Sequence, residues 1–280
     1  MKQKKKNVII PTIALLLCLS IMFISGYHLY DYYSQRINSE IDYENIRDLI
    51  DDDADDEDDS RKPVVRREAI DVNKEDDPVD HPIKHTKYDK IYEQNPDFVG
   101  WINVPGTLID YPVMQTKYDE QKYLHLNFNG YYAYEGVPFC NAISDLARPS
   151  DIITIYGHHM KYGTMFQALT YYEDKSFYQN HKTFYFDSIY RLGTYEVIGV
   201  VLTDTNDSSF KYWTVADCNS EEFYEYVNFI KNNSLYKIDA INNVEYGDML
   251  VTLSTCEYHT SNGRLIVVGK MIETDDENLI

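Results

Sequence analysis

The first part of the chain has the hydrophobic pattern of a membrane span. Four lysines within the first six residues precede an apolar run from Val8 to about Ser25. About 20 apolar residues can cross a bilayer, and positive charge before the run predicts a cytoplasmic N-terminus. A cleaved signal peptide is the alternative, but the run is longer than a typical signal core and no A-x-A site follows it. We therefore expect a cytoplasmic tail (1–7) and an uncleaved transmembrane anchor (8–26).

The next segment, residues 27–85, has two parts that differ in sequence pattern. Ile37, Ile41 and Ile46 are spaced as on one face of a helix, which predicts a juxtamembrane helix. The acidic run Asp51–Asp59, DDDADDEDD, follows. A calcium-binding EF-hand loop needs glycine at its sixth position and glutamate at its twelfth, and no register of this run supplies both. We expect the run to be a solvated, self-repelling linker.

From about Thr86 short apolar runs alternate with turn signals, as in strands. A helix is predicted over Ser220–Lys231, with Ser220 as its N-cap, and a shorter one over Met165–Tyr172. This pattern predicts a mostly β domain over 86–275, a mostly antiparallel barrel with peripheral helices, followed by a short tail, 276–280. The predicted strands are Trp101–Val104, Leu108–Val113, Ile152–Tyr156, Thr183–Phe186, Thr194–Val201, Asp248–Thr255 and Leu265–Ile272.

Composition excludes some classes of function. The net charge is −20, much of it in the acidic run, and such a balance argues against a nucleic-acid partner. There is no glycine-rich phosphate loop. The four cysteines, Cys18, Cys140, Cys218 and Cys256, form no CxxC pair and no zinc-site spacing. A disulfide between Cys140 and Cys218 stays open, because an extracellular compartment would permit it.

One cysteine and one arginine stand at the ends of two strand patterns. In "DMLVTLSTC" alternate residues share a face, and Cys256 is the last of them before a polar loop. Arg264 opens the next alternating run, so pairing of the two runs would set Cys256 opposite Arg264. A nearby cation increases the thiolate fraction of a cysteine. The alternatives are an inert buried cysteine and a surface ion pair between Arg264 and Glu257.

A thiol nucleophile needs a base, and eight histidines are available. His158 and His159 follow the strand Ile152–Tyr156 and Gly157, which we expect to let the backbone bend so that an imidazole points into a cleft. This pair could instead only pack or cap a turn, and His259, in the loop after the cysteine, stays open as a base. The other histidines are His28, His81, His85, His125 and His181.

These motifs together resemble a known family. "TLSTC", an arginine opening the next strand and "YGHHM" about a hundred residues upstream resemble a sortase, an extracytoplasmic cysteine transpeptidase of mostly Gram-positive bacteria. "NPDFVGWINVPGTLIDYPVMQ" and "YGHHMKYGTMF" are similar to class B sortases, and the resemblance covers about Tyr88–Ile272. The chain departs from the family pattern at Glu120, where asparagine is common, and at "GVPFCN". These departures bear on the sorting motif rather than on the chemistry.

The resemblance implies a sortase-like closed barrel and a role for each matching residue. Cys256 is expected to be the nucleophile, His158, preferred over His159, the general acid and base, and Arg264 the group that stabilises the oxyanion and substrate. The substrate groove is expected to include Tyr156, Leu124, Ser254, Thr255 and Glu257.

The implied reaction cleaves a C-terminal sorting signal after threonine and transfers the surface protein through a thioester to a cell-envelope amine, as in peptidoglycan anchoring. No metal or cofactor is expected. The partners would be surface proteins with sorting signals, a peptidoglycan amine and the membrane, with the catalytic domain outside. The alternatives are a sortase of another class, or a membrane-tethered binding module in which Cys256 is structural. A papain-like hydrolase fits poorly, because there the cysteine precedes the histidine.

Overall fold

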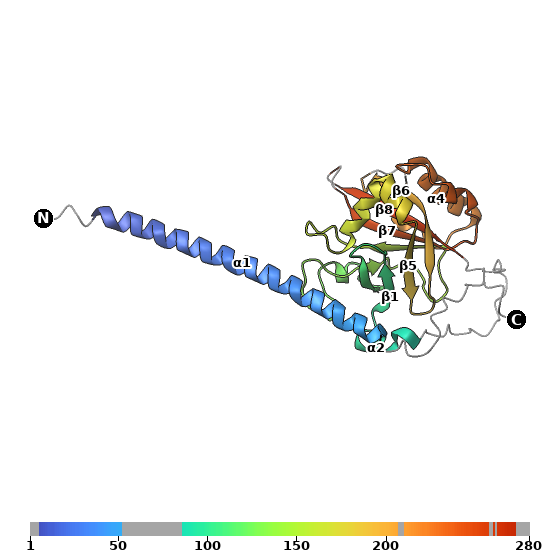
Figure 1. Ribbon diagram of the computed structural model, residues 1–280. Helices are drawn as coiled ribbons and strands as arrows, with labels where there is room; N and C mark the ends of the chain where they lie inside the picture. The colour runs from blue at the N-terminus through green and yellow to red at the C-terminus, as the bar shows by residue number, and fades with distance from the viewer. Residues whose placement is uncertain (1–5, 52–85, 207–209, 258–259, 261, 273–280) are drawn as a thin grey trace.

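The computed structural model describes residues 6–51, 86–206, 210–257, 260 and 262–272. Within these residues, strands β1 to β8 close into a barrel in the order β1-β2-β3-β4-β7-β8-β6-β5. The β2–β3 and β4–β7 pairs are parallel, and the other pairs are antiparallel. The prediction of a mostly antiparallel barrel with peripheral helices is therefore confirmed (Figure 1). The strands are β1 (Phe98–Asn103), β2 (Asp110–Met114), β3 (Phe139–Cys140), β4 (Ile152–Tyr156), β5 (Thr183–Ser188), β6 (Thr194–Asp204), β7 (Leu250–Cys256) and β8 (Gly263–Met271).

Short helices lie between and around the strands. The α-helices of the domain are α2 (Asp89–Gln94), α3 (Lys175–Asn180) and α4 (Ser220–Asn233). The single-turn and longer 3₁₀ helices are η1 (Thr86–Tyr88), η2 (Lys122–Leu124), η3 (Phe166–Glu173), η4 (Tyr212–Thr214) and η5 (Asp239–Asn243). The shorter predicted helix thus exists as η3. The sequence analysis missed β3 and α3, because strands of two residues and helices of six are too short to display a period.

Helix α4 begins one residue away from the predicted cap. Asn219, not Ser220, is the N-cap: its side chain accepts hydrogen bonds from the backbone amides of Glu221 and Glu222. The Glu222 side chain accepts from the Asn219 amide in return, which completes a capping box. The helix has an apolar stripe that faces the barrel, since Phe223, Tyr226, Val227 and Ile230 are all buried.

Strand β7 is buried on both faces. Val251 and Leu253 belong to the main core cluster, whereas Leu250 belongs to a second cluster that includes the apolar stripe of α4. On this second face the Thr252 hydroxyl is hydrogen-bonded to Tyr226 of α4. Helix α4 therefore covers one face of the strand that ends in Cys256, and this fixes the strand from both sides.

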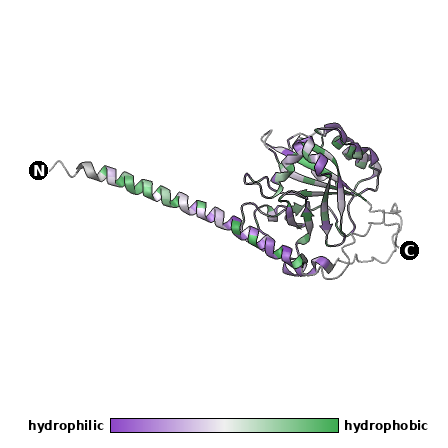
Figure 2. Cartoon of the chain, in the orientation of Figure 1, coloured by the Kyte–Doolittle hydropathy of each residue, from purple (hydrophilic) through white to green (hydrophobic). Residues whose placement is uncertain are grey.

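The N-terminal part of the chain is one continuous helix, α1 (Lys6–Asp51). Figure 2 shows its first half as apolar and its second half, which reaches the barrel, as mixed. By length and composition α1 can cross a membrane. Its second half packs on the domain: Tyr43 and Ile46 are buried in the main core, and the Tyr43 hydroxyl donates to the carbonyl of Gly136 at 3.0 Å. The acidic linker lies outside the described residues.

Two of the cysteines in the barrel domain, Cys140 and Cys218, are not bonded to each other. Cys140 and Cys218 are both free thiols, and they lie in different core clusters. Burial raises the pKa of each thiol to about 12, so both stay protonated at neutral pH. The open question of a disulfide between them is thereby answered in the negative.

Candidate active site

The barrel places Cys256 directly opposite Arg264. Strands β7 and β8 are antiparallel neighbours, and the last pair in their register is Cys256 with Arg264. The amide of Glu257 continues the ladder by donating to the carbonyl of Gly263 at 3.0 Å. The sequence analysis predicted this pairing, and it is confirmed. The main-chain ladder thus holds the residue that carries the thiol opposite the residue that carries the guanidinium.

The parallel pairing of β4 with β7 brings a histidine to the same rim. Tyr156 pairs with Ser254, and the amide of Gly157 donates to the carbonyl of Ser254 at 3.1 Å. Two parallel strands end on the same side, so His158, two residues beyond β4, lies on the side of Cys256.

Gly157 has a steric role in addition to the bend expected at this position. Its φ lies outside the left-handed region, so the backbone conformation alone does not require glycine here. A Cβ there would instead lie 2.5–2.8 Å from three atoms of the Phe166 ring, which packs directly against the backbone. The glycine makes room for η3, whose first residue holds the histidine segment: the Phe166 amide donates to the His158 carbonyl at 2.9 Å.

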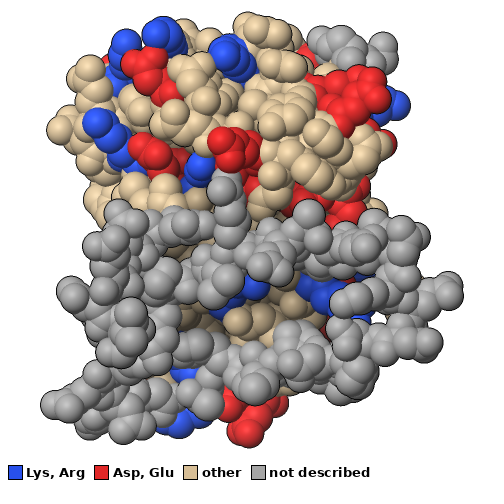
Figure 3. Space-filling view, turned by 90° about the vertical axis from the view of Figure 1, so that its right-hand side faces the viewer, with Lys and Arg blue, Asp and Glu red and all other residues tan. Residues whose placement is uncertain are grey.

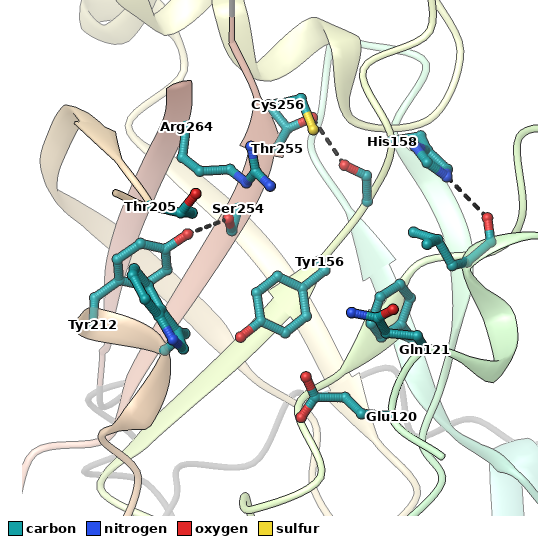
Figure 4. A pocket seen from close by; sticks show the side chains of 14 residues that line it. Glu120, Gln121, Tyr156, His158, Thr205, Tyr212, Ser254, Thr255, Cys256 and Arg264 are labelled. Atoms are coloured by element: carbon teal, nitrogen blue, oxygen red, sulfur yellow. Dashed lines mark hydrogen bonds between the residues drawn. The ribbon is translucent and has the colours of Figure 1, made fainter. Parts of the chain in front are cut away.

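The three side chains surround one pocket of about 380 Å³. In Figure 4 Arg264 and His158 lie on opposite sides, Cys256 lies at the rim between them and the Tyr156 ring extends into the space below. The pocket is lined by Glu120, Gln121, Leu124, Phe139, Tyr156, Gly157, His158, Thr205, Tyr212, Trp213, Ser254, Thr255, Cys256 and Arg264. The structure therefore brings together every predicted site residue except Glu257, which is half-buried and is not in this lining.

A main-chain carbonyl orients His158. Its Nε2 lies 2.9 Å from the carbonyl oxygen of Leu124. A carbonyl only accepts, so Nε2 carries hydrogen and Nδ1 is left as the nitrogen that takes up and releases a proton. Burial lowers the pKa of His158, the Leu124 hydrogen bond opposes this shift, and His125 lowers the pKa further. The His125 ring is stacked on His158 with centroids 5.4 Å apart.

The neighbouring histidine has a different task. His159 Nδ1 lies 2.8 Å from the carbonyl oxygen of Cys256 and donates to it. His159 is not in the pocket lining. His159 therefore connects the loop after β4 to the end of β7. The two histidines are adjacent in sequence, but only His158 lines the pocket. His259, the alternative base, lies outside the described residues.

The hydroxyls next to the thiol are hydrogen-bonded within the protein. Ser254 Oγ is 2.8 Å from Tyr212 Oη, and Thr255 Oγ1 donates to the Gly157 carbonyl at 2.9 Å. These bonds fix the end of β7 against η4 and against the histidine loop. The Ser254 and Thr255 side chains are both almost fully buried.

Other pocket residues were not predicted. Tyr212 and Trp213 come from η4, which is distant in sequence from the motifs around His158 and Cys256. Gln121, Phe139 and Thr205 also line the pocket. Glu120, noted only as a departure from the family, lines it too, and its Oε2 accepts from the amide of Ala142 at 2.8 Å. The cluster of aromatic residues in "FKYWT" was the one available signal.

The chemistry of this arrangement is that of nucleophilic catalysis. It provides a thiol, an imidazole with one nitrogen available for proton transfer, and a fixed cation around one partly apolar space. Among the described residues no group of three or more His, Cys, Asp or Glu side chains is placed to hold a metal ion.

Several known proteins are similar to this chain. A family model described as a sortase domain matches residues 102–272. The chain is 30% identical to sortase B of Staphylococcus aureus over 189 residues (67% of this chain, 75% of that protein). It is 32% identical to sortase B of Listeria monocytogenes over 185 residues (64% and 71%). A solved Staphylococcus aureus sortase B–substrate complex matches with a TM-score of 0.61 and 31% identity, covering 68% of this chain and 87% of that one.

Proposed function

The chain belongs to the sortase family of cysteine transpeptidases and is of the sortase B type, and we propose that it cleaves a C-terminal sorting signal after threonine and joins the surface protein to a cell-envelope amine. Cys256 is the nucleophile, His158 the general acid and base, and Arg264 the oxyanion donor. The observation that carries the proposal is the meeting of these three side chains around one pocket, from the ends of β4, β7 and β8.

The first step forms a thioester. The Cys256 thiol gives its proton to Nδ1 of His158, the sulfur attacks the carbonyl carbon after threonine, and the carbonyl oxygen becomes an oxyanion. Arg264 lies across the register from the sulfur, where its guanidinium can donate to that oxyanion. The peptide C–N bond then breaks, and protonated His158 gives the proton from Nδ1 to the departing amine.

The second step reverses these roles. An acceptor amine attacks the thioester carbon, and neutral His158 takes the amine's proton on Nδ1 as the C–S bond breaks and Cys256 is restored. Burial favours the neutral form of His158, since it lowers the pKa of the imidazole. Water competes with the amine, so the partly enclosed pocket favours transfer over hydrolysis.

The N-terminal helix anchors this enzyme. Residues 8–26 of α1 cross the cell membrane, with the basic tail in the cytoplasm and the barrel outside, where sorting signals and envelope amines are found. Support comes from the apolar length of α1 and the lysines before it.

The direct test uses the full chain in nanodiscs, because Tyr43 and Ile46 of α1 are part of the core. Peptides with NPQTN-like, LPxTG-like and SPxTG-like signals are incubated with the protein and with oligoglycine or a diaminopimelate-type amine, and products are read by mass. We expect an amide product and a covalent intermediate on Cys256. A product that persists in Cys256→Ala would contradict the proposal, and so would the lack of any intermediate with every peptide.

A further inference from the structure

A set of exposed tyrosines lies on the barrel domain next to helix α1, near Tyr32. We call Tyr131, Tyr132, Tyr134 and Tyr162 the tyrosine face; they belong to two loops, one before β3 and one after β4. Their side chains are 73%, 62%, 54% and 55% exposed. Large apolar rings so exposed on neighbouring loops are characteristic of a surface that meets a partner. The pocket chemistry described above does not use them.

The contacts along α1 fix where this face lies relative to the apolar half of the helix. Tyr32 of α1 is the first contact: its ring centroid is 6.1 Å from that of Tyr134 and 5.9 Å from that of Tyr162. Farther along the helix, Tyr43 reaches Gly136 and Arg47 forms an ion pair with Asp110. The tyrosine face is therefore the part of the domain nearest to the apolar half of α1.

The distance from the apolar run to this face is short. The run ends at about Ser25, and Tyr32 is seven residues later, about 10 Å along the helix at about 1.5 Å per residue. The polar headgroup zone on each side of a bilayer is about 5–8 Å thick. A tyrosine side chain spans about 6 Å, and helix tilt shortens the gap further. The rings of this face therefore reach the headgroups if α1 crosses the bilayer.

The chemistry of the two loops suits that environment. Tyrosine has an apolar ring and a polar tip, and it is enriched where membranes meet water. Residues 130–134, GYYAY, and 161–163, KYG, contain no acidic residue although the whole chain has a net charge of −20. The adjacent Glu135 is buried, at 6% exposed, and Lys161 adds a cation that suits anionic lipids. The face seen in Figure 3, on the side away from the start of α1, carries charges of both signs on its described part.

We propose that the tyrosine face rests in the headgroup zone of the bilayer that α1 crosses, and so holds the catalytic pocket beside the membrane. The proposal rests on the anchoring role of α1. His125 connects the face to the pocket: its ring lies 6.1 Å from Tyr134 and 5.4 Å from His158, centroid to centroid. The catalytic histidine is thus two ring contacts from the lipid surface. The substrates that suit this placement are sorting signals held close to the bilayer.

The experiment measures the depth of single positions in the full chain. Tryptophan is introduced in three variants, Tyr132→Trp on the tyrosine face, Phe23→Trp in the apolar half of α1, and Tyr246→Trp as a control. Tyr246 is 45% exposed and lies before the start of β7, at the other end of that strand from Cys256. Each variant is placed in vesicles of phosphatidylcholine and phosphatidylglycerol that contain a nitroxide on the headgroup or on the acyl chain. Emission of the native Trp101 and Trp213 is subtracted with the unsubstituted protein.

The expected result is loss of Tyr132→Trp emission with the headgroup nitroxide, loss of Phe23→Trp emission with the acyl-chain nitroxide, and no loss for Tyr246→Trp. Quenching of Phe23→Trp without quenching of Tyr132→Trp would overturn the headgroup proposal and leave the anchor intact. A lack of quenching at Phe23→Trp would overturn both. Circular dichroism and peptide transfer confirm that each variant is folded, so misfolding is not read as distance from the membrane.

Discussion

The two sides of the proposed catalytic pocket are built differently. On one side, Cys256 and Arg264 are a register pair of adjacent antiparallel strands, and β7 is packed on both faces. On the other side, His158 stands in a loop, and its ring is oriented by the carbonyl of Leu124 and stacked on the exposed His125. We call these the barrel side and the loop side. The barrel side is held by main-chain ladders, whereas the loop side is held by individual contacts from several segments.

This difference predicts how each side responds to substitution. The barrel side positions its groups through the fold, so changes there remove chemistry without moving neighbours. The loop side positions its histidine through contacts that single substitutions can displace. Variants of the barrel side should lose activity and keep stability, while variants of the loop side should change activity, stability and pH dependence together.

The largest expected effect is that of Cys256→Ala, which removes the proposed nucleophile. Loss of the attacking group in a catalytic unit lowers turnover by on the order of 10⁴-fold or more, while the half-buried position should leave the melting temperature nearly unchanged. The matched variant is Cys140→Ala, which removes a fully buried core thiol. It should keep its activity and lose about 1–2 kcal/mol of unfolding free energy. Peptide transfer read by mass, with thermal melts, separates the two; equal activity losses would refute the assignment.

The second effect tests the guanidinium. Arg264→Lys keeps the positive charge but loses the several N–H donors of the guanidinium. In the unsubstituted protein Nη1 of Arg264 donates to the Gly263 carbonyl at 2.9 Å, and this bond holds the guanidinium at the rim of the pocket. A lysine cannot keep this bond and also reach the oxyanion, so kcat should fall about 10²-fold, with little change in KM. Arg191→Lys is the control, because Arg191 lies outside the pocket and contacts Met249. A rise in KM at constant kcat would instead make Arg264 a ground-state binding residue.

The third prediction concerns the loop side. Gly157→Ala would place a Cβ 2.5–2.8 Å from the Phe166 ring, and Phe166 holds the His158 carbonyl. The unfolding free energy should fall by about 1–3 kcal/mol through overpacking. Turnover should fall by about tenfold or more, because a displaced catalytic group loses its productive geometry.

The control for Gly157→Ala is a second substitution, at Phe166, that removes the steric clash. Phe166→Leu is expected to lower stability when made alone, through a cavity in the core. Combined with Gly157→Ala it should restore part of both turnover and stability, since the two sites are in contact and their effects are not additive. Additive losses in the double variant would show that the steric explanation of Gly157 is wrong.

The two sides also differ in how far the sequence reveals them. Alternation in "DMLVTLSTC" and "RLIVVGKMI" predicted the strands, and their pairing set Cys256 opposite Arg264, as observed. Such patterns are readable because side chains in strands alternate with a period of two. The barrel class was predicted on the same grounds.

The loop side could not be predicted in the same way. The Leu124 carbonyl has no sequence signature, because every residue has a carbonyl, and the resemblance to sortases identified Leu124 only as a groove residue. The ring of Phe166 against Gly157 depends on how η3 folds back, so this steric role of the glycine was not predicted. Tyr212 and Trp213 come from η4, and the aromatic cluster around them did not reveal that this segment lines the pocket.

The smallest expected effect concerns His125, through the ionisation of its neighbour. His125→Phe keeps a ring stacked on His158 and removes the imidazole whose electrostatic effect lowers the His158 pKa. Burial, the largest cause of the lowered pKa, remains, so the pKa should rise only part of the way toward its ordinary value of about 6.5. The ¹H–¹³C signal of His158 Cε1, followed against pH, measures this directly.

The pH dependence of the folding stability tests the same pKa shift independently, and its direction can be predicted. Because the folded pKa of His158 lies below the unfolded value, the unfolded state binds the proton more readily, and folded stability is lost as the pH falls through about 6.5 and toward the folded pKa. In His125→Phe the two pKa values are closer, so the variant should lose less stability than the unsubstituted protein between pH 8 and pH 5. On the barrel side, Arg264→Lys should leave this difference unchanged, since no contribution of Arg264 to the His158 pKa is found. An equal acid loss in His125→Phe and the unsubstituted protein would mean that the stacked ring acts on His158 by packing alone, and the loop side would then depend on shape rather than on charge.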